Sequence, residues 1–147
     1  MKILFLHGLE SKPGGSKPTY LEGLGYTVLN PHLPSNDFPL SVEIAQEELD
    51  AENPDVVIGS SRGGAVAMSL DLKGAKLILI APAWKRFDAP GRTPPGTKIL
   101  HCKADNIVHY EDSEDVQGDP DIMACGDSHR MNDVEALETL RRAIEEI

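Results

Sequence analysis

The sequence predicts an α/β fold: a doubly wound, mainly parallel six-stranded sheet with helices on both faces. Short apolar segments alternate with helical or loop segments along the chain, a pattern typical of consecutive βαβ units. Most of these segments are apolar at nearly every position, as expected when helices cover both faces of a parallel sheet. The length of 147 residues fits a single α/β domain over residues 1–147, which can bury a sufficient core without disulfides or metals.

Six segments are expected to form the strands: residues 2–6, 27–30, 55–58, 76–81, 98–101 and 121–124. Helices are expected at residues 16–24, 40–51, 62–72 and 131–147. The last helix has the clearest pattern, because its apolar residues recur every three or four positions. Those residues are Val134, Leu137, Leu140, Ile144 and Ile147.

The segment between the fourth and fifth strands, residues 82–97, is rich in proline. It contains Pro82, Pro90, Pro94 and Pro95. Because proline interrupts helices, neither a long crossover helix nor an inserted cap domain is expected there. A site at that end of the sheet should therefore be shallow and open. The acidic segment 111–121 lacks the spacing of a calcium-binding loop and is interpreted as a solvated face.

Composition narrows the class of partner. The net charge of −10 opposes binding to nucleic acid or to an anionic membrane surface. No apolar run is long enough to cross a membrane, and the apolar segment at the start is too short for a signal peptide, so a cytoplasmic location is expected. Cys102 and Cys125 lack both CxxC spacing and clustered histidines, so they are interpreted as buried thiols, and no metal is expected.

The segment Gly59-Ser60-Ser61-Arg62-Gly63 lies between the third apolar segment and a helix of small residues. A Gly-x-Ser-x-Gly pattern between a strand and a helix places the serine on a sharp turn with its hydroxyl exposed. Glycines are needed there because side chains would clash with the crossing helix and strand. Ser61 is therefore the candidate nucleophile, and the alternative is a serine that only caps the following helix.

Two further candidates follow strand ends, in the order Ser, Asp, His that serine catalysis uses on this kind of fold. Asp105 comes shortly after strand 98–101, and His129 follows strand 121–124. Side chains just beyond the carboxyl ends of parallel strands converge on one crevice. We therefore expect His129 to act as the base for Ser61, with Asp105 orienting it.

Other residues could take these roles or complete the site. Glu111 and Asp112 are alternatives to Asp105 as the acid. His7 precedes the nucleophile at the end of the first strand, which fits a structural or oxyanion-loop role better than that of a base.

An oxyanion needs two hydrogen-bond donors. The backbone N–H of Arg62, next to the nucleophile, is the first candidate, and the N–H of Leu9, in the loop after the first strand, is the second. Trp84 could line the acyl pocket or could equally cover the edge of the core.

Six segments together carry a resemblance to a known family. They are Phe5-Leu6-His7-Gly8-Leu9-Glu10-Ser11, Pro31-His32-Leu33-Pro34, Ile58-Gly59-Ser60-Ser61-Arg62-Gly63-Gly64, Ala81-Pro82-Ala83, Lys103-Ala104-Asp105-Asn106-Ile107-Val108 and Gly126-Asp127-Ser128-His129. In this order they resemble the α/β-hydrolase superfamily and, more narrowly, compact, capless YqiA-like bacterial esterases. The resemblance implies a minimal α/β-hydrolase fold without a cap, with Ser61 as nucleophile, Asp105 as acid and His129 as base.

The expected function is therefore that of a serine hydrolase that cleaves a small carboxylic ester through an acyl-enzyme intermediate. This chemistry needs no cofactor and no metal, and the expected partner is a small-molecule ester or acyl substrate. An amidase, peptidase or thioesterase would use the same residues. A catalytically idle α/β-hydrolase scaffold that acts as a binding protein is the alternative from another class.

Overall fold

A single parallel sheet organises the chain in the computed structural model, which describes residues 1–8 and 14–147. Its strands are β1 (Lys2–Leu6), β2 (Thr27–Leu29), β3 (Val56–Ser60), β4 (Lys76–Ile80), β5 (Lys98–His101) and β6 (Asp121–Ala124). The strand order is β2-β1-β3-β4-β5-β6, and each neighbouring pair is parallel. This arrangement confirms the predicted fold class.

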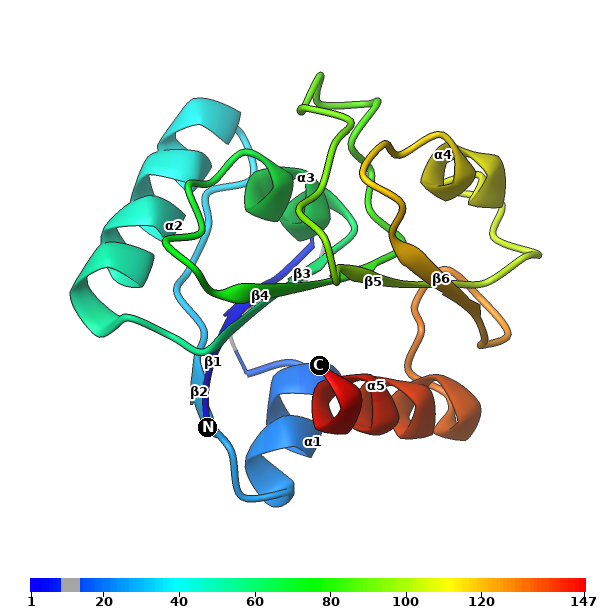
Figure 1. Cartoon of the computed structure of the whole chain (residues 1–147), viewed down its shortest axis with the longest axis horizontal. Coiled ribbons are helices and arrows are strands. Elements are labelled where there is room, and N and C mark those ends of the chain that lie inside the picture. Colours follow the sequence, from blue (N-terminus) through cyan, green and yellow to red (C-terminus); the bar gives the residue numbers. More distant parts are fainter. Residues whose placement is uncertain (9–13) are drawn as a thin grey trace.

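Helices pack on both faces of this sheet (Figure 1). They are α1 (Ser16–Gly23), α2 (Phe38–Glu52), α3 (Arg62–Met68), α4 (Tyr110–Glu114) and α5 (Val134–Glu146). Helices α1 and α5 lie on one face, and α2 and α3 lie on the other (Figure 1). Helix α4 contacts β5. Within the described residues, no helix combines the length and the apolar character that crossing a membrane requires.

The core consists of two apolar clusters, one on each face of the sheet. Successive residues of one strand alternate between them: in β1, Ile3 and Phe5 pack with α1 and α5, and Leu4 and Leu6 pack with α2 and α3. All four side chains are buried, because helices cover both faces of the strand. The near-continuous apolar character of the strand segments follows directly from this double burial.

The predicted elements agree with the structure to within a few residues, apart from two differences. Helix α3 ends at Met68, four residues before the expected end. The acidic segment 111–121 is not only a solvated face, because it overlaps the short helix α4 and contains the buried residues Ser113 and Val116. A single helical turn is too short to show a hydrophobic period, so no periodicity in the sequence predicts this helix.

Glycines allow α3 to cross close to the ends of the neighbouring strands. A Cβ at Gly63 would lie 2.6 Å from the carbonyl carbon of Leu6 and 2.7 Å from the carbonyl oxygen of His7. A Cβ at Gly64 would lie 2.8 Å from Cβ of Pro82. These neighbours lie at the end of β1 and in the loops after β1 and β4, so the helix that follows Ser61 can take this position only without side chains there.

Replacement of Gly63 by alanine is expected to destabilise the fold by about 3 kcal/mol or more, because the new methyl group meets backbone atoms that cannot move aside. The matched control is Gly23→Ala in α1, where an added Cβ has no atom within 4 Å. That change is expected to be neutral or to stabilise by up to about 1 kcal/mol. Urea unfolding of the two variants measures the difference, and equal stabilities would contradict the close crossing of α3.

Both cysteines are buried and free, as expected from their sequence positions. Burial raises the pKa of the Cys125 thiol to about 11. A thiol with such a pKa is almost entirely protonated at neutral pH and is a poor nucleophile. Cys125 is therefore a poor competitor of Ser61 as a nucleophile.

Candidate active site

Three side chains from separate loops meet at the carboxyl edge of the sheet and form a continuous hydrogen-bonded chain. Ser61 follows β3, Asp105 follows β5 and His129 follows β6. The Ser61 Oγ lies 2.9 Å from Nε2 of His129, and Nδ1 of His129 lies 2.7 Å from Oδ2 of Asp105. The structure thus brings together the three residues that the sequence predicts, and it does not place Glu111 or Asp112 in this chain.

Ser61 occupies a strained backbone conformation, with φ +55° and ψ −116°, which L residues rarely adopt. Two hydrogen bonds to residues at and just after the end of β4 hold Ser61 in this conformation. Its N–H donates to the Ile80 carbonyl at 2.8 Å, and its carbonyl accepts from the Ala83 N–H at 3.0 Å. The Ser61 side chain makes no capping hydrogen bond to α3. Its hydroxyl is therefore directed to His129 rather than used as a helix cap.

The carboxylate of Asp105 is buried, with 6% of the residue exposed, and accepts hydrogen bonds on both oxygens. Oδ1 accepts from the N–H groups of Ile107 and Val108 at 2.8 and 2.9 Å. Burial acts to raise the pKa of Asp105, but the hydrogen bonds from His129 and from these two N–H groups outweigh it and hold the pKa below its ordinary value. Asp105 therefore stays ionised and can stabilise a positive charge on His129.

His101, at the end of β5, is a second partner of this carboxylate that the sequence did not reveal. It is fully buried, and its Nε2 lies 3.1 Å from Oδ2 of Asp105 and 3.0 Å from the carbonyl oxygen of Val108. Both neighbours are acceptors, so Nε2 carries the proton. Nδ1 of His101 then accepts from the hydroxyl of Ser113 in α4 at 2.7 Å.

This network gives the carboxylate four donors: two backbone N–H groups on Oδ1, and His101 together with His129 on Oδ2. A buried carboxylate held in this way has little freedom to rotate. Its orientation determines which nitrogen of His129 carries the proton, because Nδ1–H must donate to Asp105. Nε2 of His129 is consequently left as an acceptor for the Ser61 hydroxyl.

Of the two predicted oxyanion donors, only the N–H of Arg62 lies within the described residues. Arg62 is the first residue of α3, and the N–H groups of the first helical turn have no acceptor within their own helix. The helix dipole also favours negative charge at this end. The second predicted donor, the N–H of Leu9, lies outside the described residues.

His7 takes the structural role expected for it. It is buried, its Nδ1–H donates to the Gly8 carbonyl at 2.9 Å, and its Nε2 accepts from the Leu33 N–H at 3.0 Å. These bonds require a neutral ring, because a protonated Nε2 could not accept from Leu33. Burial lowers the pKa of His7; the Gly8 hydrogen bond opposes this effect, and the charges of His32 and Arg62 add to it.

The free energy of unfolding is therefore expected to fall as the pH drops below about 6.5, the ordinary histidine pKa. The sign follows because the unfolded chain, with the higher His7 pKa, binds more protons in this range. Urea unfolding between pH 7.5 and 5 measures the slope, which should be smaller in His7→Gln. The control is His109→Gln, a change at an exposed position, and an unchanged slope in the His7 variant would contradict the assignment.

The side chain of Arg62 contributes to the structure of the elbow in a way that its sequence position does not suggest. It is 2% exposed, and its Nη2 donates to the Pro34 carbonyl at 2.9 Å and to Oγ of Ser41 at 3.1 Å. The guanidinium also lies over the rings of Phe38 and Phe87 at 5.5 and 5.6 Å. It thereby ties the residue after Ser61 to α2 and to the loop after β2.

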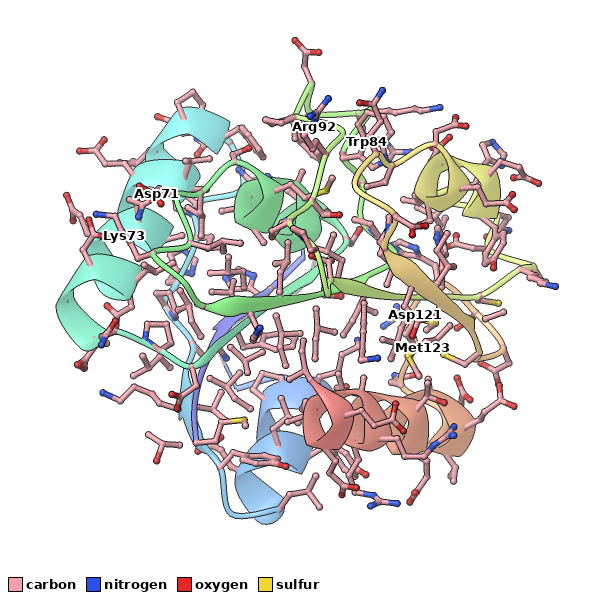
Figure 2. The ribbon with its side chains drawn as sticks, in the orientation of Figure 1. Asp71, Lys73, Trp84, Arg92, Asp121 and Met123 are labelled. Carbon is pink, nitrogen blue, oxygen red and sulfur yellow. The ribbon has the colours of Figure 1, made fainter. Side chains whose placement is uncertain are left out.

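Trp84 does not line the cavity that opens beside Ser61 and His129. It lies on the loop between β4 and β5, as does Arg92 (Figure 2), and packs against the apolar cluster on the face of α2 and α3. Its Nε1 donates to the Asp112 carbonyl at 2.8 Å. This geometry favours the second alternative for Trp84, in which it covers the edge of the core. The hydrogen bond to Asp112 also connects its loop to α4.

A cavity of about 510 Å³ opens directly beside Ser61 and His129. Its lining includes Gly8 and residues of the loops after β5 and β6, with Asn106, Ile107 and Ser128 among them. The segment between β4 and β5 contains no helix, as its prolines predict. The fold thus has no cap over this cavity in the described part of the chain.

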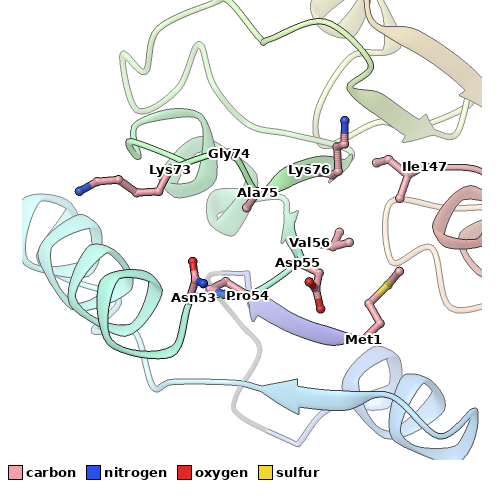
Figure 3. Close-up of a pocket in the computed structure, with 10 residues that line it drawn as sticks. All are labelled: Met1, Asn53, Pro54, Asp55, Val56, Lys73, Gly74, Ala75, Lys76 and Ile147. Atoms are coloured by element: carbon pink, nitrogen blue, oxygen red, sulfur yellow. The ribbon is translucent and has the colours of Figure 1, made fainter.

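A second cavity, of about 380 Å³, lies at the opposite edge of the sheet (Figure 3). It is lined by Met1, Asp55 and Lys76 at the amino ends of β1, β3 and β4, and by Lys73 and Ile147. Its described lining contains no serine, cysteine or histidine. The cavity beside Ser61 is therefore the candidate active site.

The arrangement at Ser61 is suited to nucleophilic catalysis. A serine hydroxyl donates to a neutral imidazole, and that imidazole is oriented by a buried carboxylate, which are the relations that activate a serine as a nucleophile. The described residues hold no group of three His, Cys, Asp or Glu side chains arranged to bind a metal ion.

Comparisons with known proteins give the fold a name. No protein-family model matches the sequence, and no curated protein sequence matches it. Solved structures do match, over 99% of this chain. A candidate hydrolase from Agrobacterium vitis S4 is 17% identical, with a TM-score of 0.81 and 87% of its own chain covered.

Two further structures agree with this match. The mouse alpha/beta hydrolase domain-containing protein 10 is 17% identical, with a TM-score of 0.76 and 88% of its chain covered. A lidless α/β serine hydrolase from Xanthomonas campestris is 22% identical, with a TM-score of 0.69 and 79% of its chain covered. The chain therefore has the compact α/β-hydrolase fold without a lid.

Proposed function

We propose that this protein is a serine hydrolase that cleaves small carboxylic esters through an acyl-enzyme intermediate. The observation that carries the proposal is the unbroken chain of hydrogen bonds from the Ser61 hydroxyl through His129 to the carboxylate of Asp105. The strained backbone of Ser61 at the strand-to-helix turn adds support, because strain of this kind is concentrated at functional positions. The structural neighbours named as hydrolases and as a serine hydrolase add further support.

In the first half of the reaction, His129 takes the proton from the Ser61 hydroxyl through Nε2 as Oγ attacks the ester carbonyl carbon. Asp105 stabilises the imidazolium that forms. The carbonyl oxygen becomes an oxyanion, for which the N–H of Arg62 at the start of α3 is the proposed donor, with Leu9 as the proposed second donor. His129 then gives its proton to the alcohol oxygen as the bond from carbon to that oxygen breaks.

In the second half, water replaces the alcohol. His129 takes a proton from this water as it attacks the acyl carbon, and then returns the proton to Ser61 as the carboxylic acid leaves. All proton transfers in this scheme pass through one nitrogen, Nε2 of His129. The scheme therefore depends on the tautomer that Asp105 and His101 maintain.

The test is hydrolysis of a butyryl group carried on three leaving groups: 4-nitrophenol, a thiol and 4-nitroaniline. An esterase is expected to hydrolyse the 4-nitrophenyl ester fastest, and the ester should give a burst of one 4-nitrophenol per protein when deacylation is slow. Fastest hydrolysis of the thioester or of the anilide would instead assign a thioesterase or an amidase. No hydrolysis of any of the three by folded protein would favour the idle scaffold.

A further inference from the structure

The described lining of the cavity beside Ser61 differs in charge from the protein as a whole. Its lining includes three basic side chains, Lys17, Arg86 and Arg130. Among the described residues that line it, there is no aspartate or glutamate, although the protein as a whole carries a net charge of −10. In an acidic protein, acidic side chains would be expected at an ordinary surface cleft more often than basic ones.

The three cations come from three separate parts of the chain. Lys17 is in the first turn of α1, Arg86 is in the loop between β4 and β5, and Arg130 directly follows His129. The fold therefore brings together, at the candidate nucleophile, positive charges that are far apart in sequence. A local run of basic residues does not explain this clustering.

Backbone contacts hold two of these cations at the cavity. Nζ of Lys17 donates to the Arg130 carbonyl at 2.6 Å, and Nη2 of Arg86 donates to the Ile107 carbonyl at 3.1 Å. Burial lowers the pKa of Lys17 to about 8, and the charge of Arg130 contributes to this shift. Like charges held close together raise the energy of the site, and a bound anion would relieve that repulsion.

We infer that the substrate of this site is an ester that carries an anionic group, a carboxylate or a phosphate, bound by Lys17, Arg86 and Arg130 beside Ser61. This inference rests on the proposed serine hydrolase activity and specifies its substrate class. Arginine and lysine suit such a group because they form charge-assisted hydrogen bonds to its oxygens. These three positive charges also offset the repulsion that the net charge of the protein exerts on an approaching anion.

The experiment compares two 4-nitrophenyl esters whose acyl groups each have six carbons, the monoester of adipic acid, which ends in a carboxylate, and the neutral hexanoate. The wild type is expected to have a kcat/KM at least about tenfold higher for the adipate ester at low ionic strength. This ratio should decrease as salt is added, because ions screen the charges. In Arg86→Gln and in Arg130→Gln the ratio is expected to fall about tenfold.

Arg92→Gln is the matched control. Arg92 lies on the same loop as Arg86 but is outside the cavity lining, where it donates to Oε1 of Gln117 at 2.8 Å. Its removal changes the net charge by the same amount, so an effect of overall charge would appear in all three variants. The inference requires that the ratio keep its wild-type value in Arg92→Gln.

Competition identifies the anion. Inorganic phosphate and succinate are each added at millimolar concentration to the hydrolysis of the adipate ester. Inhibition mainly by phosphate would assign a phosphate-bearing substrate, and inhibition mainly by succinate would assign a carboxylate. Inhibition by neither, or hydrolysis of the two esters at the same rate with no change in Arg86→Gln and Arg130→Gln, would overturn the inference.

These outcomes separate failure of the inference from failure of the proposed function. Equal hydrolysis of both esters leaves the serine hydrolase activity standing and removes only the anionic substrate. If neither ester is hydrolysed and Ser61 does not react with a neutral fluorophosphonate, the proposed function itself fails.

Discussion

Replacement of Ser61 by alanine is expected to lower kcat for ester hydrolysis by about 10⁴-fold or more. The variant loses the hydroxyl that bonds to Nε2 of His129, and no acyl-enzyme can form on it. Residual activity would come from substrate binding and from the oxyanion donors. Steady-state kinetics with 4-nitrophenyl butyrate measures the loss, and circular dichroism checks that the variant is folded.

The matched control for this substitution is Ser69→Ala. Ser69 lies at the other end of α3, and its hydroxyl donates to the Ala65 carbonyl at 2.9 Å. The control is expected to retain wild-type kcat, because Ser69 is outside the cavity lining. A Ser61→Ala variant that is folded and turns over at the wild-type rate would show that another group is the nucleophile.

The substitution Asp105→Asn is expected to lower kcat by about 10³- to 10⁴-fold while the protein stays folded. The reason lies in the donors around the carboxylate. Oδ1 faces two backbone N–H groups, so the asparagine oxygen must take that place and its NH₂ group must face His101 and His129. His129 would then accept at Nδ1 and carry its proton on Nε2, where it could no longer accept the proton of Ser61.

The neighbouring acids provide the comparison for this prediction. Glu111→Gln and Asp112→Asn remove the two carboxylates that the sequence left as alternatives, and both are expected to retain activity. Kinetics of the three variants on one ester separates the roles. Activity that survives Asp105→Asn and is lost in Glu111→Gln or Asp112→Asn would transfer the role of acid to that residue.

Much of the fold and the three side chains at Ser61 could be predicted because both depend on short segments of sequence. A buried parallel strand appears as a short apolar run, and the residues just after such runs meet at one edge of the sheet. Asp105 and His129 were predictable on this basis, since each follows a strand by only a few residues. The Gly-x-Ser-x-Gly pattern of Ser61 also carries its geometry locally, because the required turn needs glycines at fixed positions.

The rest of the site depends on contacts between distant segments, which a single sequence does not encode in a local pattern. In the sequence, His101 looks like an ordinary strand residue. Its contact with Asp105 depends on the path of the loop after β5, which carries the carboxylate. The sequence position of Trp84 is equally compatible with the pocket and with the core. The structure decides between them, because the indole donates to the Asp112 carbonyl in α4. Lys17, Arg86 and Arg130 are scattered through an acidic chain, and their common location follows only from the topology.

The most direct test of the proposed function is intact-mass analysis after incubation with a neutral fluorophosphonate, which reacts with activated serines. The wild type is expected to gain the mass of one phosphonyl group, and Ser61→Ala to gain none. Such a result would establish that Ser61 is activated, whichever acyl group the protein accepts. Folded wild-type protein that remains unlabelled, or a Ser61→Ala variant that is labelled as fully as the wild type, would contradict the account.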